Sequence, residues 1–271
     1  MVNIRRLSRT GIEYLDYCWN FYSGCHHKQL GVCPPEFTCW AESITKRFKD
    51  RYSNGFEPAF YPRAFLSPLS LKKAARIGCA FMGDLFGDWV NPDSKIRELP
   101  LSFETEDLGF SLSCSLREII FNVIEARPEH TFIFLTKNPK GLLRWSPFPD
   151  NCEVGFTACN REMLKAGCYI MHDVDARVKF VSIEPMLEET WVLSLSLIVA
   201  GIPWVIIGAQ TKPFRPPKAE WVELMVDVAD YANAKVFLKN NLWPLLKDIK
   251  KYPWAFNEEG RLRQELPEHS V

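Results

Sequence analysis

Short apolar segments that alternate with amphipathic segments are the feature that most restricts how these 271 residues can fold. The apolar segments lie at 79–84, 131–135, 153–157, 178–183, 204–207 and 236–238. Each is short enough for one strand, and most pairs are separated by a segment with helical periodicity. Strands buried on both faces and joined through helices are typical of βα units with a parallel sheet. The sequence therefore predicts an α/β fold.

Helix signals support this interpretation at three places. Ser115 and Glu118 have the spacing of a capping box before an apolar face, and Arg127-Pro128 predicts the end of that helix. A helix is also predicted from Trp40 and another over 218–232. Right-handed crossovers would close such a sheet into a full or partial TIM-like (β/α) barrel. A doubly wound open sheet remains the alternative, because spacing alone does not distinguish the two.

We expect one domain over residues 1–271, with a cysteine loop at 19–41, an insertion near 88–113 and a C-terminal extension near 243–271. Lys plus Arg and Asp plus Glu both number 33, so the net charge indicates neither nucleic acid nor membrane as partner. Residues 191–209 carry no charge, but Gly201 and Pro203 interrupt them. They predict a buried helix followed by a buried strand rather than a membrane span.

The N-terminal sequence lacks the apolar core of a signal peptide, so we expect a cytoplasmic protein with reduced thiols. The whole chain has nine cysteines, and three of them, Cys25, Cys33 and Cys39, lie in the loop WNFYSGCHHKQLGVCPPEFTCWA. Their C-x7-C-x5-C spacing suits an iron–sulfur cluster or zinc, and three ligands leave a fourth metal position open. Cys39 precedes a predicted helix, whose N-terminus favours a thiolate.

Two other readings of the three cysteines stay open. His26 or His27 could complete a Cys3His zinc site, although the spacing is looser than in common zinc motifs. The three could also be ordinary free cysteines. The remaining cysteines are scattered and are interpreted as core or surface residues: Cys18, Cys79, Cys114, Cys152, Cys159 and Cys168.

The run W-N-x-x-[ST]-G-C, followed by a spaced cysteine and C-[WY]-A, resembles the opening of a radical S-adenosylmethionine-like family common in phages, bacteria and archaea. Five later blocks are similar to that family in the same order: FMGDLFGDWV (81–90), TFIFLTKNP (131–139), KFVSIEPML (179–187), WVIIGAQT (204–211) and VFLKNNL (236–242). Most members are described only as phage-type or of unknown function. The family more often ends its motif in C-x2-C, and here residues 34–38 lengthen that gap.

The resemblance implies a radical S-adenosylmethionine enzyme with a barrel fold. Cys25, Cys33 and Cys39 would hold a four-iron four-sulfur cluster whose free iron binds the methionine moiety of S-adenosylmethionine. A flavodoxin- or ferredoxin-like protein would supply the electron, and the substrate is open. Two alternatives remain: a non-catalytic binding protein stabilised by zinc or a cluster, and a lyase that modifies or repairs nucleic acid or a nucleobase.

Polar residues follow most of the predicted strands, and in a parallel barrel the carboxyl ends of the strands form one rim. Residues expected there in catalysis are Lys137, Glu184 and Lys239. Residues expected there in cofactor binding are Gly83, Asp84, Thr136, Gly208 and Gln210, together with Trp40 beside the cysteine loop. At least one of the two lysines should have an acidic neighbour, because an unpaired buried charge is costly. The competing explanation is that strands often end in polar loop residues.

Overall fold

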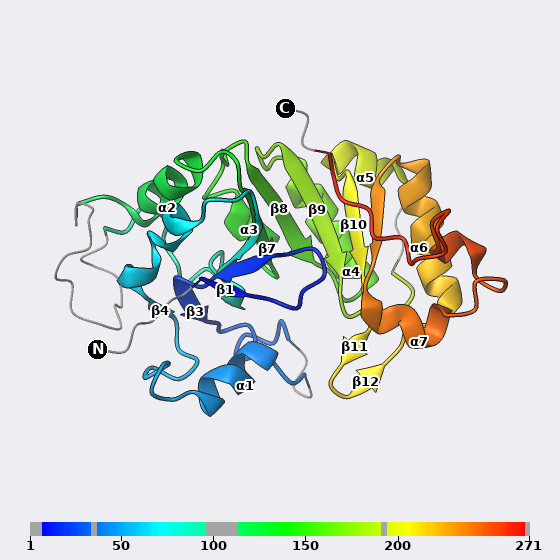
Figure 1. Cartoon of the computed structure of the whole chain (residues 1–271), viewed down its shortest axis with the longest axis horizontal. Helices are drawn as coiled ribbons and strands as arrows, with labels where there is room; N and C mark the ends of the chain where they lie inside the picture. Colours follow the sequence, from blue (N-terminus) through cyan, green and yellow to red (C-terminus); the bar gives the residue numbers. More distant parts are fainter. Residues whose placement is uncertain (1–6, 34–36, 96–112, 191–193, 269–271) are drawn as a thin grey trace. The chain divides into compact units, whose positions relative to one another are not determined.

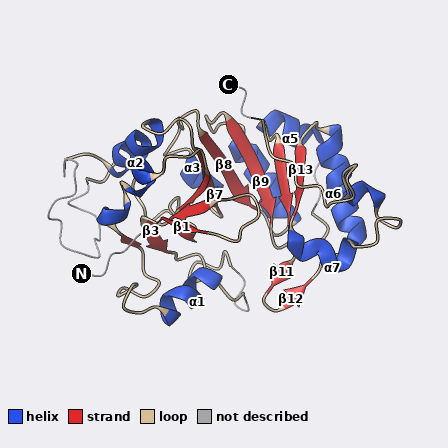
Figure 2. Ribbon diagram, in the orientation of Figure 1, coloured by secondary structure: helices blue, strands red, loops and turns tan. Residues whose placement is uncertain are grey.

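The computed structural model describes residues 7–33, 37–95, 113–190 and 194–268 (Figure 1). The chain divides into two compact units, and each is considered by itself. The first comprises Met1–Glu153 with Asp175–Arg177, and the second comprises Val154–Val174 with Val178–Val271. Both combine strands with helices (Figure 2), so the predicted α/β class is confirmed.

The first unit contains a four-stranded portion of sheet in the order β1 (Leu7–Arg9), β2 (Tyr17–Trp19), β5 (Arg76–Cys79) and β7 (Thr131–Thr136). β1 is antiparallel to β2, whereas β2, β5 and β7 run parallel. The helices of this unit are α1 (Trp40–Arg47), α2 (Leu116–Glu125) and α3 (Pro139–Leu142), with 3-10 turns η1 (Pro62–Ala64) and η2 (Ser67–Ser70). The middle residues of β5 and β7 are apolar and mostly buried, and polar residues stand at the strand ends: Arg76, Thr131 and Thr136.

A small second sheet in the same unit positions the cysteine loop. Its strands follow the order β4 (Ala59–Phe60), β3 (Tyr22–Gly24) and β6 (Met82–Gly83). β3 is antiparallel to β4 and parallel to β6. The loop with the three cysteines therefore begins where β3 ends, directly beside the end of β6.

The second unit has strands in the order β8 (Cys152–Thr157, which begins in the first unit), β9 (Val178–Ile183), β10 (Trp204–Ile207) and β13 (Lys235–Leu238). β9, β10 and β13 are parallel. The connecting helices are α4 (Arg161–Met171), α5 (Ser194–Ala200) and α6 (Ala219–Tyr231). A hairpin of β11 (Gln210–Thr211) and β12 (Phe214–Arg215), the turns η4 (Asn240–Leu242) and η5 (Pro253–Ala255), and α7 (Trp243–Leu246) complete the unit.

Most predicted elements are confirmed within two residues. The capping box is present: Glu118 N donates to Ser115 Oγ (3.2 Å), and Ser115 N donates to Glu118 Oε2 (2.6 Å). The uncharged stretch is helix α5 followed by strand β10, with residues 191–193 outside the described part, and β10 is buried as expected. The expectation that the helix is buried is wrong, because Leu195, Ile198 and Val199 are 62%, 51% and 55% exposed. No helix among the described residues has the length and apolar character needed to cross a membrane.

The predicted strand over 79–84 is wrong. β5 ends at Cys79, and Ala80 then adopts φ 59°, a left-handed conformation that turns the chain before β6 begins at Met82. The stretch 79–84 is therefore divided between the two sheets of the first unit: Cys79 ends β5 in the larger sheet, and Met82 begins β6 in the smaller one. Of the insertion predicted near 88–113, residues 96–112 lie outside the described part, and Lys95 forms an antiparallel bridge with Ser115.

Candidate functional site

Each defined residue of the W-N-x-x-[ST]-G-C run makes a contact that fixes the start of the cysteine loop. Trp19 Nε1 donates to the carbonyl oxygen of Ala64 (2.7 Å), and Asn20 Oδ1 accepts from Met82 N (3.3 Å). Ser23 Oγ and Tyr61 Oη are hydrogen-bonded at 2.9 Å. These contacts hold β3 in place, so the direction in which the chain enters the loop is set by buried side chains.

Gly24 and Gly83 pair across β3 and β6, immediately before Cys25 and Asp84. Gly24 has φ +97°, and a Cβ there would overlap the backbone of Glu57 and Pro58. A Cβ on Gly83 would overlap the backbone of Gly24. Gly83, predicted to bind cofactor, thus has a structural role, because it allows the two backbones to approach closely.

Two cysteines of the loop, Cys33 and Cys39, lie within electrostatic reach of the third, Cys25. The pKa of Cys25 is raised to about 12, mainly by burial, and negative charge on Asp84, Cys33 and Cys39 would raise it further. Cys33 is buried, and Cys39 is the N-cap residue of α1, as predicted. Among the described residues, no three His, Cys, Asp or Glu side chains are arranged to hold a metal ion. Residues 34–36, between Cys33 and Cys39, lie outside the described part.

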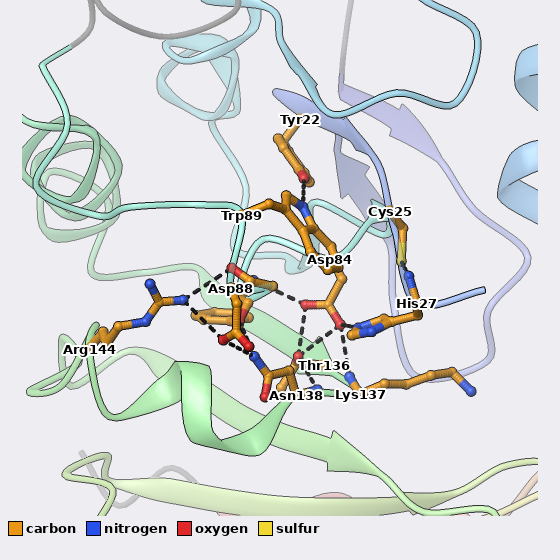
Figure 3. A network of polar contacts seen from close by, with 12 residues as sticks. Tyr22, Cys25, His27, Asp84, Asp88, Trp89, Thr136, Lys137, Asn138 and Arg144 are labelled. Carbon is orange, nitrogen blue, oxygen red and sulfur yellow. Dashed lines mark hydrogen bonds and ion pairs between the residues drawn. The ribbon is translucent and has the colours of Figure 1, made fainter. Parts of the chain in front are cut away.

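Asp84 is the centre of a buried polar network beside this loop (Figure 3). Its carboxylate accepts hydrogen bonds from Thr136 Oγ1 (2.7 Å), Lys137 N (2.9 Å) and Phe86 N (3.0 Å). A further contact joins Asp84 Oδ2 to His27 Nε2 at 2.6 Å. The carboxylate therefore ties the end of β6 to the end of β7 and to the cysteine loop. Thr136 and Asp84, two predicted site residues, are in direct contact.

His27 belongs to this network through its contact with Asp84. The sequence did not predict that His27 would pair with Asp84. Both partners of the His27–Asp84 pair are almost fully buried, at 4% and 5% exposure. His27 N also donates to Cys25 Sγ (3.4 Å), and His27 Nδ1 has no hydrogen-bond partner among the described residues. The position of His27, two residues after the first cysteine, was the only signal in the sequence.

Trp89 covers this part of the network. Its ring lies 5.0 Å from the ring of His26 and 5.2 Å from that of His27, measured between centroids. Its Nε1 donates to Tyr22 Oη (2.8 Å). Trp89 therefore packs against the buried His27 while its polar atom is satisfied, whereas the His26 side chain stays 33% exposed. Sequence reasoning missed this residue as well.

The FMGDLFGDWV and LTKNP blocks interlock further along the chain. Asn138 Nδ2 donates to the carbonyl oxygen of Phe86 and to Asp88 Oδ1, both at 2.9 Å. The Lys137 side chain instead places its Nζ 5.2 Å from the centroid of the Phe37 ring. Lys137 therefore contacts Asp84 through its backbone N–H, and its side chain contacts the Phe37 ring.

In the second unit, Lys239 has the acidic neighbour expected for one of the two lysines. Its Nζ lies 2.7 Å from Glu184 Oε1, and the two side chains are 14% and 24% exposed. Gly208 lies against Glu184, since a Cβ on Gly208 would come within 3.1 Å of the Glu184 carboxyl group. Asn241 forms two hydrogen bonds with the backbone of Ala209, at 2.9 and 3.0 Å. The SIEP, WVIIG and FLKNN blocks therefore meet at the carboxyl ends of β9, β10 and β13.

Two predicted site residues lie outside these contacts. Gln210 is buried and donates through Nε2 to the carbonyl oxygen of Pro213 (3.0 Å), which stabilises the β11–β12 hairpin. Trp40 is the first residue of α1 and is 45% exposed. The structure thus brings Asp84, Thr136 and the backbone of Lys137 together in one unit, and Glu184, Gly208 and Lys239 together in the other. A single rim that unites the two groups remains a prediction.

A family model described as "Protein of unknown function (DUF5131)" matches residues 9–112 and 110–247. The two matched segments together cover most of the chain, including the cysteine loop and every interlocking block described above. Comparison with curated proteins and with solved structures gave no match. The chain belongs to the DUF5131 family of proteins of unknown function.

Proposed function

We propose that this protein is a radical S-adenosylmethionine-type enzyme in which Cys25, Cys33 and Cys39 hold a four-iron four-sulfur cluster. The observation that supports this most is that Cys33 and Cys39 both raise the pKa of Cys25 electrostatically, on one loop beside a buried Asp84–His27 pair. The finer architecture, a full or partial parallel barrel, is part of the same proposal.

The donor set fits a metal cluster on chemical grounds. Thiolates are the ligands of iron–sulfur clusters, and three of them close together repel one another. The pKa of about 12 for Cys25 means that this thiol is protonated at neutral pH in the absence of a cation. A bound cation offsets both the repulsion and the burial, so ligation and deprotonation should occur together. When bound, the reduced cluster would supply the electron that cleaves S-adenosylmethionine to a 5′-deoxyadenosyl radical.

The residues of the chain would then orient the cysteine loop, shield the buried network from water and bind groups of the cofactor or substrate. Asp84 positions the loop through its contacts with His27, Thr136 and the backbone of Lys137. Trp89 excludes water from this network, which a radical intermediate requires. Glu184 and Lys239 offer a partly exposed acid and base for cofactor or substrate groups, and Gly208, which has no Cβ, lets the Glu184 carboxyl group lie against its backbone. Trp40 and Gln210 are proposed to contact the cofactor, and a flavodoxin- or ferredoxin-like protein to supply electrons.

A zinc-stabilised binding protein is the second candidate, and His27 favours it. Histidines that ligate metals usually donate their other ring N–H to a carboxylate. His27 Nε2 makes such a contact with Asp84, which leaves Nδ1 as a possible fourth ligand to a Cys3His zinc site. Zinc in such a site would be colourless and redox-inactive, whereas a cluster would be brown.

Metal analysis of anaerobically purified protein tests both candidates. We expect iron and sulfide in the wild type and their loss when Cys25, Cys33 or Cys39 is replaced by Ala. Cys18→Ser is the matched control, because Cys18 lies in β2 close to the loop but outside it. S-adenosylmethionine should change the electron paramagnetic resonance spectrum of the reduced protein, and 5′-deoxyadenosine should form. Stoichiometric zinc without iron, or loss of iron in Cys18→Ser, would contradict the assignment.

A further inference from the structure

Exposed aromatic and cationic side chains gather on two adjacent segments of the second unit, residues 209–218 and 239–251. Over these segments the sequence has seven basic residues and one acidic residue, although charges balance over the whole chain. Lys239 is paired with Glu184, which leaves six basic residues. The residues considered below are all exposed and are called the hairpin–α7 surface: Lys212, Phe214, Arg215, Trp243, Lys247 and Lys250.

Two contacts within the unit bring these segments together. The paired hydrogen bonds between Asn241 and the backbone of Ala209 join the base of the β11–β12 hairpin to the start of α7. Helix α6, which follows the hairpin, packs against η5 beyond α7. Figure 1 accordingly shows the hairpin next to α7. The surface is therefore built from two segments that are fixed to each other, not from one loose loop.

The two aromatic side chains of this surface are each about half exposed. Phe214 is 49% exposed and Trp243 is 48% exposed. None of Lys212, Arg215, Lys247 and Lys250 forms an ion pair with another residue in the described part of the chain. The single acidic residue, Asp248, accepts hydrogen bonds from the backbone of Lys250 and Lys251 at 3.1 and 3.3 Å. Its position in a turn thus explains its presence among the cations.

We propose that the hairpin–α7 surface binds single-stranded nucleic acid. Cations without acidic partners attract a phosphate backbone, and exposed aromatic rings stack on unpaired bases. A duplex offers phosphates, but its bases are already stacked on one another and are not available to aromatic side chains. An acidic protein or an anionic membrane has negative charge but no bases. A surface that carries both aromatic rings and cations therefore matches single-stranded nucleic acid better than it matches a duplex, an acidic protein or a membrane. This inference does not depend on the cluster, and it names a polymer partner beyond the proposed radical chemistry.

Fluorescence anisotropy with a labelled 20-nucleotide oligothymidylate tests the proposal on the full-length protein at low and high salt. Phe214→Ala and Trp243→Ala should each weaken binding roughly five- to tenfold or more, since base stacking contributes at this level. Trp243→Phe should retain most of the affinity because it keeps a ring. Lys212→Gln with Lys247→Gln should weaken binding and reduce its salt dependence.

Tyr169→Ala and Tyr231→Ala are the matched controls, since these aromatic side chains are 81% and 82% exposed elsewhere in the same unit. They should leave the dissociation constant unchanged, and a duplex of the same length should bind more weakly. The proposal is overturned if the Phe214 and Trp243 variants bind like the wild type. It is equally overturned if duplex DNA or phosphatidylserine vesicles bind as tightly as the single strand.

Discussion

The two units each place a carboxylate at the end of parallel strands, but they satisfy it to different degrees. Asp84 is 5% exposed and receives hydrogen bonds from two backbone N–H groups, a hydroxyl and an imidazole. Glu184 is 24% exposed at its side chain, and one lysine is its partner in the contacts that the structure defines. A carboxylate that is saturated by buried donors organises the fold around it. A carboxylate with one partner and access to solvent can exchange that partner for a ligand.

This difference leads to a separation of roles. The Asp84 network should matter chiefly for stability and for the shape of the cysteine loop. The Glu184–Lys239 pair should matter chiefly for what the protein binds. Stability measurements and ligand measurements on the same variants distinguish these roles, because each role affects one observable more than the other.

The largest effect is expected for Asp84→Ala. This change leaves the N–H groups of Phe86 and Lys137 and the Thr136 hydroxyl without their acceptor in a buried region. Each unsatisfied buried group costs about 1–3 kcal/mol, so we expect a loss of roughly 3–5 kcal/mol in the free energy of unfolding. Urea denaturation monitored by circular dichroism measures it.

Asp88→Asn is the control for Asp84→Ala, because the side chain of Asp88 is 82% exposed and accepts from Asn138 at the surface of the same network. It should change the free energy of unfolding by less than about 1 kcal/mol. A similar small cost for Asp84→Ala would show that water replaces the carboxylate, and that Asp84 does not organise the unit.

The contrast between the units also shows what the sequence could and could not reveal. A strand such as 204–207 was predictable because burial on both faces requires continuous apolar residues. The break at Ala80 was not, since a left-handed alanine has no signal in composition. Asp84 and Thr136 were predictable as strand-end residues. The pairing of His27 with Asp84, 57 positions apart, depends on how β3 and β6 align.

The second prediction compares Cys25 with Cys168, one thiol from each unit. The pKa of each is raised to about 12, in Cys168 by burial and in Cys25 by burial together with Asp84, Cys33 and Cys39. In metal-free protein at pH 8, both should react with iodoacetamide roughly 30- to 60-fold more slowly than in urea. The reason is that the thiolate fraction falls by more than the nucleophilicity rises. Mass spectrometry of labelled peptides measures both rates.

The direction of the pH dependence follows from the same raised pKa. The folded state keeps the Cys25 proton up to about pH 12, whereas the unfolded state releases it near pH 9. This thiol therefore contributes to stability below pH 9, and the contribution is lost as the pH rises toward 12. Asp84→Asn should accelerate labelling of Cys25 and leave Cys168 unchanged. Equal acceleration at both cysteines would indicate general loosening of the fold instead of a local electrostatic effect.

The smallest effect concerns Lys239. Replacement by Met keeps an apolar stem of similar length and removes the charge that pairs with Glu184. Because the pair is partly exposed, the free energy of unfolding should change by less than about 1 kcal/mol. Affinity for S-adenosylmethionine or turnover to 5′-deoxyadenosine should fall roughly tenfold, about 1.4 kcal/mol, while the iron content stays constant. Lys165→Met, on the exposed face of α4, is the control and should change neither quantity. Unchanged binding and turnover in Lys239→Met would mean that the pair is only a surface ion pair. A large loss of stability would instead make it a structural counterpart of the Asp84 network, and the separation of roles between the two units would then fail.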